Sequence, residues 1–65
     1  MMNIEYENER QYYSAIRRKK KIKLKYIAVK LGVSVPLISM WENNKTNMSS
    51  GLIENYKQII DKKQI

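Results

Sequence analysis

The sequence contains neither cysteine nor histidine among its 65 residues. Disulfide cross-links and the usual zinc or haem ligands are therefore excluded, and no thiol or imidazole is present for catalysis. We accordingly expect no enzymatic activity, no cofactor, no metal and no small-molecule substrate. No apolar run approaches the roughly 18 residues of a membrane span, and no signal-peptide pattern is visible, so we expect no membrane partner and a cytoplasmic location.

Acidic residues are also few, and they are unevenly placed. Six carboxylates stand against thirteen Lys and Arg residues, which gives a formal net charge of +7. From Arg10 to Met40 the sequence has nine basic residues and no acidic one. A basic balance of this size indicates a polyanionic partner, although charge alone accounts only for non-specific attraction.

The chain is expected to form one all-α domain. Residues 1–7 show no sustained periodicity and are interpreted as an N-terminal arm, residues 8–62 as the domain and residues 63–65 as a tail. A chain of this length builds only a small core, so a partner subunit is a further expectation.

Periodic apolar residues predict the first two helices. Asn8 and Gln11 resemble a capping box at the start of a first helix over residues 8–20. Its apolar stripe consists of Tyr12, Tyr13, Ala15 and Ile16. A second helix over residues 24–31 has apolar residues at i, i+3, i+4 and i+7, and Gly32 follows where a left-handed C-cap residue is favoured. These apolar residues are Leu24, Ile27, Ala28 and Leu31.

Capping signals predict the third helix. Ser34 is the expected N-cap, and Val33 and Ile38 have the spacing of a hydrophobic staple. Pro36 falls in the first turn, where its missing N–H is tolerated. Asn44 is the expected left-handed exit residue.

A fourth helix is expected after a polar loop, capped by Ser49 or Ser50. Its inward residues are expected to be Leu52 or Ile53, then Tyr56, Ile59 and Ile60. Ile22, Ile38 and Trp41 complete the expected core, because the spacing of the last two places them on one face of the third helix.

A family resemblance rests on the segment around Gly32. The residues that carry it are Ile27-Ala28, Leu31-Gly32-Val33-Ser34, Ile38-Ser39 and Trp41-Glu42. At this spacing, residues 13–60 resemble the Cro/C1-type helix-turn-helix family, the lambda-repressor-like regulators common in temperate phages and mobile elements. The resemblance implies a compact lambda-repressor-like DNA-binding domain with its helix-turn-helix at about residues 24–43. It also implies a transcriptional regulator that acts at double-stranded operator DNA and is associated with the nucleoid of a bacterial cell.

The resemblance also implies which residues would contact DNA, since in this family the third helix enters the major groove. The recognition-helix residues carried over are Ser34, Val35, Pro36, Leu37, Ser39, Met40 and Asn43. The basic residues expected at phosphates are Arg17, Arg18, Lys23, Lys25 and Lys45. An alternative reading of the basic run at residues 17–21 is a solvated helix end that favours the macrodipole.

The expected reading surface is unusually apolar. Val35, Pro36, Leu37 and Met40 cannot form the paired hydrogen bonds that discriminate bases by about 1–3 kcal/mol each. Three interpretations follow. In the first, the helix reads DNA through thymine methyl groups with help from Ser39 and Asn43. In the second, it docks on another repressor through the set Val35, Leu37 and Met40, and the protein is a co-repressor or anti-repressor. In the third, Leu37 and Met40 are simply half-buried in the core or in a homodimer interface.

A homodimer is expected from the C-terminal part of the sequence. Related domains usually have a fifth helix that closes the core, whereas few residues follow Ile60 here, so the fold is interpreted as a truncated five-helix domain. The residues expected to pack against a second copy are Tyr56, Ile59, Ile60 and Ile65. Such a dimer would also supply a second reading helix.

Overall fold

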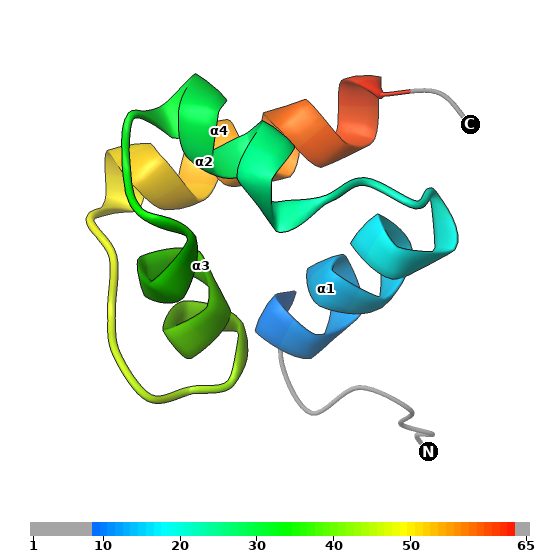
Figure 1. The fold of residues 1–65 in the computed structure, drawn as a ribbon. Coiled ribbons are helices and arrows are strands. Elements are labelled where there is room, and N and C mark those ends of the chain that lie inside the picture. The colour runs from blue at the N-terminus through cyan, green and yellow to red at the C-terminus, as the bar shows by residue number, and fades with distance from the viewer. Residues whose placement is uncertain (1–8, 64–65) are drawn as a thin grey trace, which may run out of the picture.

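Four helices make up the fold of this computed structural model, which describes residues 9–63 (Figure 1). They are α1 (Glu9–Lys19), α2 (Leu24–Leu31), α3 (Val35–Glu42) and α4 (Ser50–Lys62). The predicted all-α class and the bounds of the second helix are confirmed. The proposed capping residue Asn8 lies outside the described residues.

The predicted caps define both ends of the helix-turn-helix. Gly32 has a φ of 71° and ends α2 in the left-handed region. The Ser34 hydroxyl accepts a hydrogen bond of 3.2 Å from the backbone N–H of Leu37. Asn44 leaves α3 with a φ of 62°. At α4, the cap is Ser49, whose hydroxyl accepts a bond of 3.3 Å from the N–H of Leu52.

The two glycines of the chain make opposite predictions for stability. Gly32 needs a positive φ, whereas Gly51 lies within α4. At either position an added Cβ would be in open space, with no packed neighbour from residues 9–63 within 4 Å. Gly32→Ala is therefore expected to lower the free energy of unfolding by about 1–2 kcal/mol. Gly51→Ala is expected to raise it by about 0.4–1 kcal/mol, because it lowers the entropy of the unfolded chain. Urea unfolding followed by circular dichroism measures both, and equal effects would contradict the assigned backbone conformation.

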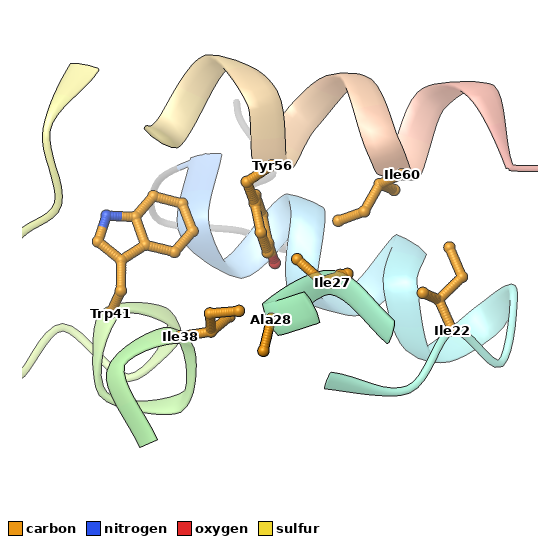
Figure 2. Packing of buried hydrophobic residues seen from close by; sticks show 7 residues of the cluster. All are labelled: Ile22, Ile27, Ala28, Ile38, Trp41, Tyr56 and Ile60. Atoms are coloured by element: carbon orange, nitrogen blue, oxygen red, sulfur yellow. The ribbon is translucent and has the colours of Figure 1, made fainter. Parts of the chain in front are cut away.

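The core lies where the four helices converge, with α2 against α3 and α4 and with α1 against the same pair. Seven residues form it, as Figure 2 shows: Ile22, Ile27, Ala28, Ile38, Trp41, Tyr56 and Ile60. The Trp41 and Tyr56 rings meet edge to face with their centroids 4.9 Å apart. Each of these residues was an expected core position, including Ile22, which precedes α2 and folds back.

Two expectations about exposed and buried residues are wrong. Tyr12 was expected in the apolar stripe of the first helix, but it is 47% exposed, whereas Tyr13 and Ile16 pack against the core. Tyr56 and Ile60 were expected at a dimer surface, but both side chains are fully buried inside the single chain. A second copy cannot contact them without unfolding α4.

The other two residues of the expected dimer surface, Ile59 and Ile65, do not define an interface. Ile59 is half-buried and packs against the core. Ile65 lies outside the described residues. The homodimer therefore stays a prediction, and the structure supplies no support for the surface first assigned to it.

No single helix within residues 9–63 is long and apolar enough to cross a membrane. Helices α2 and α3 are long and apolar enough for a membrane span only when they are taken together, and they are bent by 112° relative to each other.

Candidate nucleic-acid interface

Helix α3 presents a mainly apolar face to solvent. The Gly32 turn and the Ser34 cap direct α3 away from α2, with a bend of 112° between the two helices. Val35 is 36% exposed and Met40 is 44% exposed, while Pro36 is also exposed. Leu37 and Ser39 are half-buried. The exposed face thus contains three apolar side chains and the cap hydroxyl of Ser34, so Met40 is a surface residue and only Leu37 is partly covered.

Asn43 is less free to read bases than the sequence indicated. It is exposed at the C-terminal end of α3, but its side-chain N–H donates to the backbone carbonyl of Ser39 at 2.8 Å. This bond directs the amide group toward its own helix. One of the two side chains expected to form hydrogen bonds with bases is therefore already engaged.

A buried charged network holds the C-terminal end of α3 against α1 and α4. Arg17 of α1 donates two hydrogen bonds to the Glu42 carboxylate, from Nε at 2.8 Å and from Nη2 at 3.1 Å. A third bond runs from Arg17 Nη1 to the Ile22 carbonyl at 3.0 Å. Tyr56 of α4 donates from its hydroxyl to the same carboxylate at 2.5 Å.

The assignment of Arg17 to phosphate binding is therefore wrong. Its side chain is buried, and its donors are satisfied by Glu42 and the Ile22 carbonyl. Moving this guanidinium to a phosphate would leave the Glu42 carboxylate buried without its charge partner, at a large desolvation cost.

Tyr56 remains a hydrogen-bond donor over the whole ordinary pH range. Burial raises the pKa of its phenol above the usual value, and the hydrogen bond to the Glu42 carboxylate raises it further. The network thus joins three helices through one carboxylate. The sequence analysis did not predict this network, because Arg17 belongs to a run of basic residues. The signal that could have revealed it is spacing: Arg17 directly follows Ile16 and is four residues beyond Tyr13, so it lies at the edge of the inward face of α1.

A second arginine, Arg10, anchors the loop that follows α3. Its Nη1 donates to the carbonyls of Trp41 at 3.1 Å and Thr46 at 2.9 Å, and its Nη2 donates to Asn47 Oδ1 at 2.6 Å. The guanidinium also lies 5.0 Å from the centre of the Trp41 ring, within the range of a cation–π contact. Arg10 therefore positions the loop that carries Lys45, a role that the sequence did not reveal.

The other expected phosphate ligands are exposed but do not form one cluster. Arg18, Lys23, Lys25 and Lys45 have no ion pair within residues 9–63. Arg18 shares a hollow of about 350 Å³ with Asn43 and Asn44, at the C-terminal end of α3. Lys23 and Lys25 instead line a separate hollow at the start of α2. The structure therefore brings Arg18 beside α3 and places the two lysines at the opposite end of the motif.

The sequence matches one known family profile. The profile described as Helix-turn-helix, HTH_3, matches residues 14–60. The matched segment contains all of α2 and α3, and it extends from within α1 into α4. Comparisons with curated proteins and with solved structures give no significant match.

Proposed function

The chain belongs to the HTH_3 family of Cro/C1-type helix-turn-helix proteins, and on this basis we propose that it is a small transcriptional regulator that binds operator DNA through α3. Family membership brings DNA binding as the general function. The placement of α3 in the major groove, and the residues that contact bases and phosphates, are parts of the proposal.

One observation carries this proposal further than the family name. Two cations that no carboxylate neutralises within residues 9–63 lie at the C-terminal end of α3: Arg18 beside that end and Lys45 in the loop after it. Cations next to a groove-binding helix fit phosphates that border the groove. Lys23 and Lys25 extend the cationic surface to the start of α2.

The composition of the α3 face sets the kind of recognition that we expect. Val35, Pro36 and Met40 can contact thymine methyl groups, and Ser34 and Ser39 can form single hydrogen bonds. Neither contact supplies the discrimination of a bidentate pair. We therefore propose binding in which phosphate contacts supply most of the affinity and sequence preference is modest.

A second candidate function follows from the same apolar face. Val35, Leu37 and Met40 offer a surface that another repressor can cover, and methionine adapts well to partner surfaces. In this case the protein is a co-repressor or anti-repressor, and α3 contacts protein instead of bases. The hydrogen bond from the Asn43 amide to its own helix favours this alternative, because it restricts one of the few polar side chains available for contacts with bases.

The proposal predicts a steep salt dependence of DNA binding. Each neutralised phosphate contributes about −0.9 to the slope of log K against log salt, so four cations predict a loss of roughly a hundredfold between about 50 and 200 mM salt. Fluorescence anisotropy with a labelled random-sequence duplex measures this slope. Lys45→Gln is expected to reduce its magnitude by about 0.9.

Lys62→Gln is the matched control for this titration, because Lys62 is exposed at the end of α4 and makes the same charge change. Its slope is expected to equal that of the unmodified protein. Absence of duplex binding at the lower salt concentration would reject direct DNA contact. Recovery of DNA binding only after a second repressor is added would favour the co-regulator alternative.

A further inference from the structure

A hollow at the start of α2 combines an apolar floor with a rim of lysines. Its volume is about 550 Å³, and it is lined by residues of the turn after α1, of the outer face of α2 and of the end of α4. The floor is formed by Ile22, Tyr26 and Val29. The rim is formed by Lys21, Lys23, Lys25, Lys30 and Lys63.

Two apolar side chains of the floor are more exposed to solvent than is usual for residues of their type. Val29 is 71% exposed, and Tyr26 is 37% exposed. The ring of Tyr26 lies between two ammonium groups, with Lys63 Nζ 4.5 Å and Lys30 Nζ 5.3 Å from its centre. No carboxylate lines this hollow in the part of the chain that the structure describes.

These features together define the occupant that the hollow fits. Five lysines favour a segment with carboxylates, and an uncovered valine and tyrosine favour one that also carries large apolar side chains. A DNA backbone supplies the negative charge but has nothing that gains from covering Val29. An acidic segment with alternating apolar residues satisfies both parts.

The chain itself contains one segment of this kind. Residues 4–7 read Ile-Glu-Tyr-Glu, so acidic and large apolar residues alternate. Among the other carboxylates, Glu9 pairs with Lys57, Glu42 is buried, and Asp61 accepts a hydrogen bond from Tyr13. Glu54 is exposed, but it lies within the helix α4 and so does not belong to an extended segment of alternating acidic and apolar residues. The glutamates at positions 5 and 7 therefore remain as the carboxylates best suited to the lysine rim.

The length of α1 prevents this segment from filling the hollow of its own chain. Glu9 begins α1, and the hollow begins beyond the opposite end, at Lys21. The eleven residues of α1 span about 16 Å at 1.5 Å per residue. Tyr6 and Glu7 precede Glu9 by three and two residues, so their backbone reaches at most about 11 and 7 Å from it. The segment as a whole therefore cannot lie in the hollow of its own chain, which begins beyond the end of α1.

We infer that residues 4–7 of a second copy of this chain bind in the lysine-rimmed hollow. In an extended segment, alternate side chains point to opposite sides, so Ile4 and Tyr6 cover the floor while Glu5 and Glu7 meet the rim lysines. The exchange can be reciprocal, with each copy supplying one segment and one hollow. This inference does not depend on DNA binding.

Intermolecular paramagnetic broadening tests the contact directly. Because the chain has no cysteine, Asn3→Cys provides a single site for a nitroxide label. We expect this labelled copy, mixed with ¹⁵N-labelled unmodified protein, to broaden the amide signals of Tyr26 and Val29 in the unmodified copy. A label at Ser50→Cys, exposed at the end of α4 opposite to Lys63, is the control and is expected to leave these two signals sharp.

The result that overturns the inference is an unbroadened Tyr26 and Val29 at the highest soluble concentration. A second test uses protein that carries both the nitroxide and ¹⁵N in the same chain. If the Tyr26 and Val29 signals of this protein stay broadened after dilution with unlabelled protein, the segment binds its own chain and the inference is overturned. Sedimentation equilibrium provides an independent readout, with an expected mass above the 7.8 kDa of one chain.

Charge-reversal variants then test which glutamates and lysines are in contact. The pair Glu5→Lys and Glu7→Lys is expected to abolish both the broadening and the excess mass. Mixing this variant with a copy carrying Lys30→Glu and Lys63→Glu is expected to restore them, since the charges are reversed on both sides. Failure to restore either signal, with both variants folded by circular dichroism, would show that these charges do not meet.

Discussion

Replacing Glu42 by alanine is expected to remove most of the stability of the domain. The carboxylate accepts two hydrogen bonds from Arg17 and one from Tyr56, all in a buried site. Breaking a buried ion pair from one side costs about 3–5 kcal/mol, because the remaining charge is left without a partner. A domain of this length has a total stability of about 3–10 kcal/mol. Urea unfolding followed by circular dichroism measures the loss.

Glu54→Ala is the control for this experiment, because Glu54 is an exposed carboxylate on α4. Its midpoint is expected to stay close to that of the unmodified protein. The triple variant Arg17→Met, Glu42→Leu and Tyr56→Phe is expected to recover much of the stability, since it removes the charges and the phenol together. Equal midpoints for Glu42→Ala and Glu54→Ala would show that the network contributes little.

A carboxylate on the exposed face of α3 is expected to weaken DNA binding by roughly five- to thirtyfold. Val35→Asp places a negative charge on the surface that we propose to lie in the major groove, where DNA phosphates repel it. At an effective dielectric constant between those of protein and water, this repulsion is worth about 1–2 kcal/mol. The fold is expected to be unaffected, because aspartate is favourable in the first turn of a helix. Fluorescence anisotropy with a duplex gives the change in affinity.

Gln58→Glu is the matched variant, because it adds the same charge on the exposed side of α4. It is expected to change the affinity by much less than Val35→Asp. Similar losses for the two variants would mean that only net charge matters and that α3 has no special role.

Most of the backbone plan follows from local chemistry in the sequence. Gly32, Ser34, Asn44 and Ser49 each solve a local problem at a helix end, either a positive φ or an unpaired backbone N–H. The structure places Gly32, Ser34 and Asn44 as predicted, and of the two predicted caps of α4, Ser49 and Ser50, it is Ser49 that caps the helix. These signals act over a few residues, which is why they can be read without knowledge of the packing.

Side-chain burial depends on how the helices cross, and here the sequence was less informative. Tyr12 and Tyr13 are adjacent and similar, yet only Tyr13 packs against the core. Arg17 and Arg18 are identical in type, yet one is buried with Glu42 and the other is exposed. A small rotation of α1 decides which of the two enters the core, and periodicity does not resolve that rotation.

The candidate site was predicted in part for the same reason. The resemblance located the exposed face of α3, and Val35, Pro36 and Met40 are indeed at the surface. It did not reveal that Asn43 bonds to its own helix or that Arg10 holds the loop after α3. Both contacts depend on side-chain geometry, and Arg10 bridges more than thirty residues of sequence to do so.

Chemical-shift mapping with a duplex tests the central proposal, that α3 is the DNA-binding surface, most directly. When ¹⁵N-labelled protein is titrated with a random-sequence duplex at low salt, we expect the largest amide shifts at Val35, Met40 and Lys45. Amides on the exposed side of α4, such as that of Gln58, are expected to stay unchanged. Large shifts confined to α4, or no shifts in α3 while the duplex is bound, would contradict the proposal that α3 is the DNA-binding surface.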